Sequence, residues 1–250
     1  YLMRNEDEIN NPKFIIQTAI LAAIPLALIV KEPDLSTTIV TFLIIASLMF
    51  VTGLSYKLVG IVLGITIPAI AILLLVIVNK GSSILQGYQS LRILAWLKPE
   101  EYPETAYQQQ NSIMAIGSGQ FFGKGLYNNS VDSVKNGNYI SEPHTDFIFS
   151  VAGEEMGFLG SVLIILLLLF IVYECIQTAK VAKDLSGKLI CSGMAALVGF
   201  QSFVNICVVT GLFPNTGLPL PFVSYGLTSL VTMYFGMGFV LNVGLQAKKY

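Results

Sequence analysis

A short acidic stretch carries most of the candidate chemistry in this sequence. Residues 141–155 read SEPHTDFIFSVAGEE and contain the only histidine of the chain, His144. Its acids are Glu142, Asp146, Glu154 and Glu155. A partly desolvated aspartate can have its pKa raised until it serves as a general base, and Asp146 lies at the start of an apolar piece. The alternative is a group of acids at a helix N-terminus, stabilised by the helix dipole and wetted by water.

Two other polar stretches interrupt apolar sequence. KEPDLSTT covers residues 31–38, where Asp34 or Ser36 can cap a following helix. GLFPNTGLPLPFVSYG covers residues 211–226 and contains three prolines and three glycines, which prevent a regular helix. If such a segment lies at membrane depth, its backbone must line a cavity or be buried in protein.

The elements that would position these residues are membrane helices. Of the 250 residues, 54% are hydrophobic and only 12% are charged, and the mean hydropathy is +0.71. A bilayer core takes about 20 apolar residues to cross as a helix. Six apolar runs approach that length and exclude a signal peptide as their source. They lie near residues 14–30, 36–54, 58–78, 157–178, 189–212 and 224–246.

Charge and cysteine usage exclude other classes of protein. The net charge of −1 indicates no basic surface for nucleic acid. All three cysteines fall in or beside the apolar runs, so no disulfide framework or paired metal spacing is present in the loops. We interpret the cysteines as small buried apolar residues.

The lysines and arginines predict which way the chain faces. Positive residues in short loops stay on the cytoplasmic side. Six crossings place eight of them on that side: Arg4, Lys13, Lys57, Lys180, Lys183, Lys188, Lys248 and Lys249. Both ends of the chain are then cytoplasmic, and residues 79–156 form one long outer loop. All three polar stretches fall on the outer side, which predicts an outward-facing cavity.

The outer loop has parts of its own. Ile84, Tyr88, Leu91 and Ala95 repeat with helical spacing, so we expect an amphipathic helix at the outer membrane surface. Arg92 lies on that predicted helix. The glycine-rich stretch AYQQQNSIMAIGSGQFFGKGLYNNS follows, and we interpret it as a re-entrant or half-buried segment.

Four motifs together identify a family. EPDLSTT, AYQQQNSIMAIGSGQFFGKG, EPHTDFIFSVAGEEMGFLG and LFPNTGLPLPFVSYG, in this order, resemble the SEDS family (shape, elongation, division, sporulation), to which RodA, FtsW and SpoVE belong. The resemblance covers essentially the whole chain. It implies an all-α integral membrane protein, a bundle of about ten helices of which six spans are expected here. The opening YLMRNEDEIN resembles the end of the family's fourth helix, so we expect this chain to be the C-terminal portion.

The resemblance also implies an activity. The family consists of peptidoglycan glycosyltransferases that polymerise lipid II at the outer face of the bacterial cytoplasmic membrane, in elongation, division or sporulation. Undecaprenyl pyrophosphate is released, and the partner is a class B penicillin-binding protein, a transpeptidase. Two alternatives stay open: a transporter that flips lipid II, and a scaffold for the transpeptidase. Polar motifs on one face favour the enzyme, because a transporter tends to show repeats and midplane sites.

The same resemblance implies roles for individual residues. The family's essential aspartate falls on Asp146, as general base or as holder of a divalent cation such as Mg or Mn that assists the leaving group. Arg92 and Lys124 are candidates for pyrophosphate contact. The full set of expected substrate-binding residues is His144, Thr145, Glu154, Glu155, Arg92, Lys124, Glu32 and Asp34. The sequence departs from the family at Leu227, where a second glycine is usual after SYG, and at PNTG, where PVTG is common.

Overall fold

The computed structural model describes residues 1–32, 34–80, 87–126, 133, 137, 139–140 and 143–247. Within those ranges the secondary structure is helical and contains no strand. The elements are η1 (Leu2–Glu8), α1 (Pro12–Lys31), α2 (Leu35–Val51), α3 (Tyr56–Lys80), α4 (Gly87–Leu97), α5 (Pro103–Ser118), α6 (Ile148–Lys180), α7 (Leu185–Val209) and α8 (Leu227–Ala247). Predictions that involve Ile84, Glu142, Lys248 and Lys249 lie outside the described residues.

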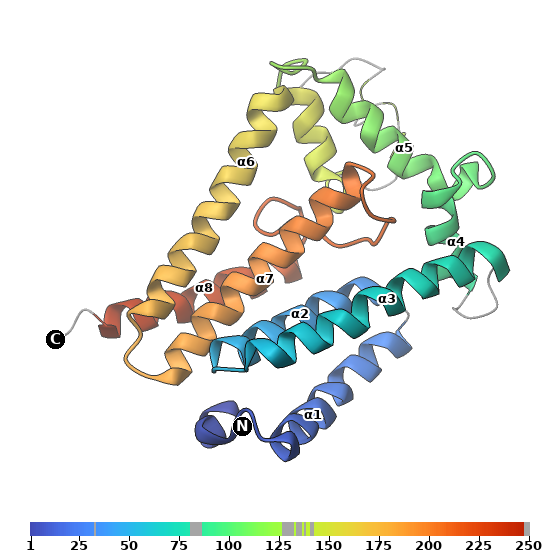
Figure 1. Cartoon of the computed structure of the whole chain (residues 1–250). Helices are drawn as coiled ribbons and strands as arrows, with labels where there is room; N and C mark the ends of the chain where they lie inside the picture. Colours follow the sequence, from blue (N-terminus) through green and yellow to red (C-terminus); the bar gives the residue numbers. More distant parts are fainter. Residues whose placement is uncertain are drawn as a thin grey trace.

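A helix occupies each of the six apolar runs. Four helices, α1, α6, α7 and α8, are long and apolar enough to cross a membrane, and α2 is a shorter apolar helix of 17 residues. The prediction that the chain is an all-helical protein with membrane-spanning helices is therefore confirmed. Figure 1 places both termini and the α6–α7 and α2–α3 turns toward one end of the molecule, while α4, α5 and loop 211–226 lie toward the other.

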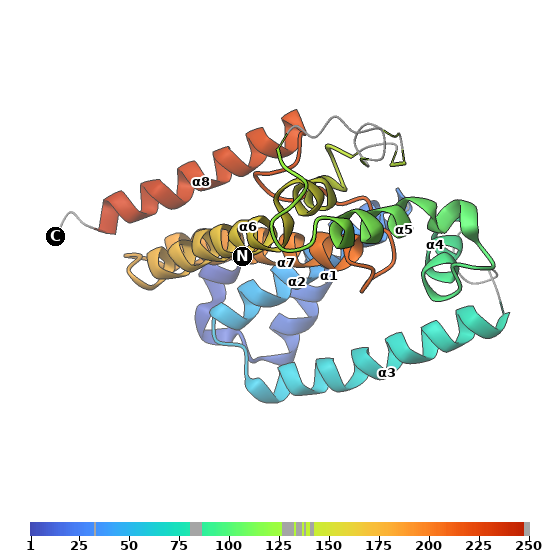
Figure 2. The ribbon, with the colours of Figure 1, turned by 90° about the horizontal axis from the view of Figure 1, so that it is seen from above.

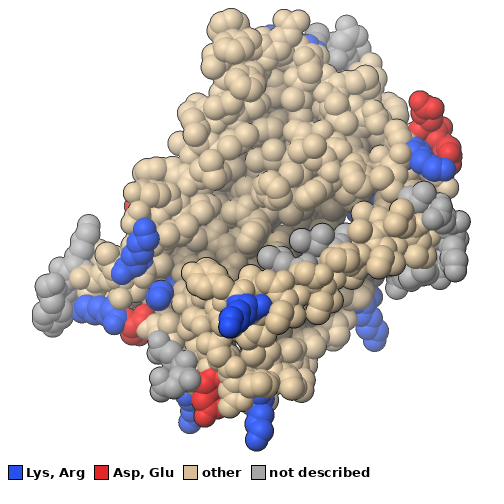
Figure 3. Space-filling view, viewed as in Figure 1, with Lys and Arg blue, Asp and Glu red and all other residues tan. Residues whose placement is uncertain are grey.

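The helix α7 is the centre of the bundle. It packs against α6, α2 and α8, and Figure 2 shows α8 on the opposite side of α6 and α7 from α3. Half of the apolar stretch of α7 is buried, against 11% to 22% for the other three candidate spans. The outer helices keep apolar side chains exposed, and the charged side chains on the face in Figure 3 lie mostly at its margins. An uncharged band of this kind suits contact with lipid.

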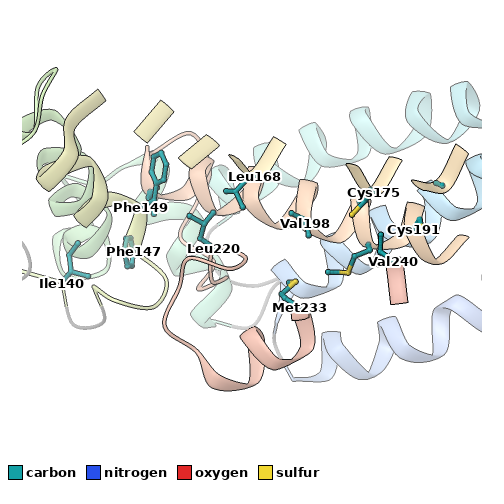
Figure 4. Close-up of a cluster of buried hydrophobic side chains, with 14 of the residues drawn as sticks. Ile140, Phe147, Phe149, Leu168, Cys175, Cys191, Val198, Leu220, Met233 and Val240 are labelled. Carbon is teal, nitrogen blue, oxygen red and sulfur yellow. The ribbon is translucent and has the colours of Figure 1, made fainter. Parts of the chain in front are cut away.

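One hydrophobic core joins the long helices to the polar end of the molecule. Figure 4 shows Leu168 of α6, Val198 of α7 and Met233 of α8 in a continuous row of buried side chains. The row continues to Leu220 in loop 211–226 and to Phe147 just before α6. The two segments that carry the candidate chemistry are thus anchored in the same core as the helices.

The helix α6 is broken at Gly157, where φ is +66° and ψ is −160°. The break frees backbone groups that pair with residues 120–125: Lys124 N–H donates to Glu154 O at 2.9 Å, and Phe158 N–H donates to Gln120 O at 2.9 Å. A Cβ on Gly157 would lie 2.3 Å from Gly123 N, which is closer than atoms tolerate. Glycine at 157 therefore lets the outer-loop turn dock into the opening of the helix.

Replacing Gly157→Ala should destabilise the protein by about 2–5 kcal/mol, because the alanine meets both a left-handed φ and a backbone overlap. A thermal melt of the purified protein in detergent measures the loss. The matched control is Gly64→Ala in α3, where an added Cβ meets nothing within 4 Å and should not lower the melting temperature. Equal melting temperatures for the two variants would contradict the docking described above.

Candidate active site

Loop 211–226 is irregular backbone whose carbonyl groups are satisfied by side chains from several elements. The donor–acceptor distances run from 2.6 to 3.4 Å. The pairs are Trp96 with Gly211 O, Gln109 with Phe213 O, Arg92 with Asn215 O, Ser36 with Thr216 O, Asn205 with Leu218 O and Gln201 with Pro219 O. Donors from α2, α4, α5 and α7 thus converge on one loop and hold its shape.

The segment that carries Asp146 is held by this loop and by α7. Three successive carbonyls accept hydrogen bonds: His144 O from Tyr225 N–H at 2.9 Å, Thr145 O from the Ser224 hydroxyl at 2.7 Å, and Asp146 O from the Asn205 amide at 2.7 Å. The rings of His144 and Tyr225 also meet edge to face, with centroids 5.9 Å apart. The backbone of residue 146 is therefore fixed on the loop before α6 begins.

The carboxylate of Asp146 lies against the backbone of Gly217. Its Oδ2 atom is 3.3 Å from the position that a Cβ on Gly217 would occupy, and Gly217 has a φ of +75°. The Asp146 side chain is half-buried. A half-buried carboxylate on a fixed backbone is suited to accept a proton from a bound hydroxyl.

A cavity of about 310 Å³, lined in part by residues 214–216 of the same loop, brings two predicted residues together. Asp34, Arg92 and Thr216 line it, with the start of α2 on one side and α4 on the other. Asp34 caps α2, as one sequence reading proposed, since its Oδ1 accepts from Thr37 N–H at 2.9 Å. Ser36, the other candidate cap, instead donates to Thr216 O at 3.4 Å.

A second cavity, of about 210 Å³, contains a buried ion pair. Lys124 Nζ lies 2.8 Å from Glu154 Oε1, and Glu154 is 1% exposed. The Ser133 hydroxyl donates to the other oxygen of Glu154 at 3.3 Å. The sequence reading that placed Lys124 at pyrophosphate did not foresee this pairing, which engages its charge with a carboxylate.

The remaining predicted residues have different surroundings. Glu32 is the exposed C-cap of α1. His144 is exposed and Thr145 is half-buried, both in the segment held by loop 211–226, and Glu155 is half-buried in α6 next to Glu154. The expected cluster of acids thus divides, with Asp146 at the loop and Glu154 at Lys124.

Sequence reasoning missed the amide residues that build the site. Asn205 is 1% exposed and Gln201 is 8% exposed, both on α7. Both stand within an apolar run of the sequence, where polar side chains are costly unless they serve a purpose. That signal was available in the sequence, but only the structure shows which carbonyl groups they hold.

The fold and the site together define an all-helical membrane protein with its polar residues gathered at one end. Residues 1–249 match the family model of FtsW, RodA and SpoVE, which is described as cell cycle protein. The chain belongs to this family.

Named relatives support this family membership. The probable peptidoglycan glycosyltransferase FtsW of Geobacter sulfurreducens is 36% identical over 230 residues, which cover 92% of this chain and 58% of that protein. The FtsW of Buchnera aphidicola subsp. Schizaphis graminum is 34% identical over 254 residues, which cover 99% and 68%. This chain therefore spans between half and about two thirds of the length of these relatives.

Two solved structures share the fold. A chain of a peptidoglycan synthase complex, studied for its coordination of polymerization and crosslinking, matches with a TM-score of 0.72 and 28% identity, over 96% of this chain and 64% of that one. The rod shape determining protein RodA of Thermus thermophilus matches with a TM-score of 0.59 and 26% identity, over 98% and 62%.

Replacing Asn205→Leu should destabilise the protein and displace Asp146. The isosteric leucine leaves the carbonyls of Asp146 and Leu218 without their donor, at a cost of about 1–3 kcal/mol for each buried group. Thermal unfolding in detergent measures this loss. Asn242→Leu on the exposed face of α8 is the control and should leave the melting temperature unchanged. If the Asn205→Leu variant were as stable as the wild type, the hydrogen bond from Asn205 to Asp146 O would contribute nothing to stability.

Replacing Lys124→Met should remove the cation that lies against the buried Glu154 carboxylate. The loss should fall near the lower end of about 3–5 kcal/mol, because the Lys124 side chain is 31% exposed. Adding Glu154→Gln should restore much of the stability, and a double-mutant cycle of melting curves measures the coupling. A pyrophosphate contact with no structural role predicts instead an unchanged melting temperature and additive variants.

Proposed function

We propose that the protein is a glycosyltransferase that polymerises lipid II into peptidoglycan glycan strands. The observation that carries the proposal is the fixed Asp146 carboxylate beside Gly217, at the end of the bundle where the polar segments meet. Membership of the FtsW, RodA and SpoVE family supports it, as does the name of the Geobacter relative.

In the proposed reaction Asp146 is the general base. A sugar hydroxyl of one lipid-linked substrate attacks the anomeric carbon of the other, and a new carbon–oxygen bond forms. The bond from that carbon to the pyrophosphate oxygen breaks, and undecaprenyl pyrophosphate leaves with the bonding electrons. The hydroxyl proton passes to the Asp146 carboxylate. Held carbonyls at residues 144–146 keep the carboxylate in place during this transfer.

A divalent cation remains a prediction and takes no step in this proposal. Among the residues that the structure describes, no three side chains of His, Cys, Asp or Glu gather as metal ligands would. If a cation binds with the substrate, it would neutralise pyrophosphate charge. Asp146 is the residue we expect to face it.

We propose further that six helices cross the membrane: α1, α2, α3, α6, α7 and α8. The lysine-bearing turns and both termini would face the cytoplasm, and α4, α5 and loop 211–226 would face outward. Supporting this, those two sets of segments lie toward opposite ends of the molecule (Figure 1). Beyond the break at Gly157, residues 158–180 of α6 are long enough, at about 1.5 Å per residue, to cross the hydrocarbon.

The partner in this proposal is a class B penicillin-binding protein. The solved relative in a peptidoglycan synthase complex supports a partner that crosslinks the strands. The scaffold role is compatible with the enzyme, whereas a lipid II transporter is the competing function. The gathering of the polar segments at one end favours chemistry at one membrane surface.

Asp146→Asn should lower lipid II polymerisation by about 100-fold or more, because a general base typically contributes that much. The assay follows glycan strand length with the full-length protein and its transpeptidase partner, and a thermal melt checks folding. Asp184→Asn is the matched control: Asp184 caps α7 at the opposite end, and asparagine caps equally well. Normal strands from Asp146→Asn would remove Asp146 from the chemistry. No polymer from the wild type, with lipid II crossing liposome membranes, would favour the transporter.

A further inference from the structure

Three phenylalanine side chains form an exposed patch at the break in α6. Phe121 and Phe122 lie on the turn that follows α5, and Phe158 is the first residue of α6 after Gly157. The ring centroid of Phe121 lies 5.0 Å from that of Phe122 and 5.8 Å from that of Phe158. All three residues are more than half exposed, and Phe122 is 78% exposed. We propose that this aromatic patch inserts into the outer leaflet of the bilayer, among the acyl chains of phospholipids.

The aromatic patch continues the apolar surface of α6. Exposed apolar side chains follow Phe158 at helical spacing: Leu159, Leu163, Leu166 and Phe170. This stretch belongs to a candidate membrane span. The Phe121 ring stacks on Phe158 at the end of that span, where Figure 1 shows the turn after α5 beside the top of α6. The turn thus extends a surface that suits contact with lipid.

Hydrocarbon excludes an irregular turn unless the protein itself satisfies the backbone polar groups of that turn. Gln120 O accepts a hydrogen bond from Phe158 N–H at 2.9 Å, and Phe121 O accepts one from Leu159 N–H at 3.3 Å. A break in a helix leaves the N–H groups that follow it without helical partners. The turn and α6 therefore satisfy each other, and the carbonyl groups beside the exposed rings do not require water.

The charge on the turn is compensated within the protein. Lys124 is the one charged side chain between residues 119 and 126. Its Nζ atom lies 2.8 Å from Oε1 of Glu154, which is buried. A cation that is paired with a carboxylate costs less to bring near hydrocarbon than a cation without a partner. The ion pair therefore removes the main obstacle to placing this turn in the leaflet.

Insertion of the aromatic patch would set the depth of the first part of α6. The N–H groups of Lys124 and Gly125 donate to the carbonyls of Glu154 and Glu155 at 2.9 and 3.0 Å. An anchored turn would hold residues 148–157 at the membrane surface through these bonds. This lipid contact requires α6 to cross the bilayer, but it does not require the glycosyltransferase activity.

The test measures where residue 122 lies in the full-length protein, reconstituted in liposomes of phosphatidylethanolamine and phosphatidylglycerol. Phe122→Cys is labelled with the environment-sensitive fluorophore NBD. Lipids that carry a nitroxide on the acyl chain quench a label in the leaflet, and iodide quenches a label in water. The cysteines of this chain are buried, and the wild type treated with the fluorophore gives the background. The aqueous control is Glu100→Cys in the exposed α4–α5 turn, and the acyl-chain control is Leu167→Cys on the exposed face of α6.

We expect the label at residue 122 to lie about 5–10 Å into the boundary between headgroups and acyl chains, as interfacial apolar faces do. Its emission should shift to shorter wavelength than that of the label at residue 100. Nitroxide lipids should quench it and iodide should not, which is the reverse of residue 100. Iodide quenching equal to that at residue 100 would overturn the lipid contact. A label at residue 122 shielded from both quenchers would also overturn it, because protein would then cover the patch.

The acyl-chain control separates two ways in which the lipid contact can fail. If nitroxide lipids quench at residue 167 while iodide quenches at residue 122, α6 crosses the bilayer and the aromatic patch alone is refuted. If nitroxide lipids do not quench at residue 167, the crossing by α6 fails and the patch fails with it. Melting curves check folding, and Phe121→Cys replaces Phe122→Cys with the same expected result if the latter does not fold. Lipid II polymerisation is measured separately, so its failure is distinguishable from both results.

Discussion

Irregular backbone inside a membrane protein must have its carbonyl groups satisfied by the protein, because hydrocarbon offers no hydrogen bonds. Loop 211–226 obeys this constraint by drawing side-chain donors from α2, α4, α5 and α7. The donors in turn fix how those helices approach one another at this end of the bundle. Asp146 is placed by the same network, since Asn205 holds its carbonyl and that of Leu218. The site is therefore a consequence of satisfying a buried loop.

The break in α6 also leaves backbone groups that must find hydrogen-bond partners within the protein. Where the helix opens at Gly157, its freed N–H and C=O groups pair with residues 120–125, so neither partner is left unsatisfied. The ion pair between Lys124 and Glu154 joins the same two segments by their side chains. A buried pair of this kind costs desolvation but fixes one arrangement of the chain. The turn at 120–125 and the start of α6 are thus joined by both backbone and side-chain contacts.

The two hydrogen-bond networks give Asp146 and Glu154 different surroundings. Asp146 lies at loop 211–226, where its carboxylate approaches the backbone of Gly217. Glu154, only eight residues later, is engaged with Lys124 and stabilises the fold. Rigidity under a reactive group matters because proton transfer requires hydrogen-bond geometry to be held closely. A loop held by six side chains provides that rigidity at the end of otherwise lipid-facing helices.

The sequence by itself determined the class of protein, the positions of the apolar helices and the segments that meet at the site, but not that Pro103–Ser118 forms the helix α5. Apolar runs long enough for a bilayer, and prolines and glycines at 211–226, carry this information locally. Asp34 as a helix cap was likewise readable from KEPDLSTT. Only the tertiary structure decided that Lys124 pairs with Glu154, that Ser36 reaches Thr216 and that Asn205 holds Asp146. Those contacts join residues from 30 to 180 positions apart, and which donor meets which carbonyl depends on how the helices pack, a relation that no local pattern in the chain records.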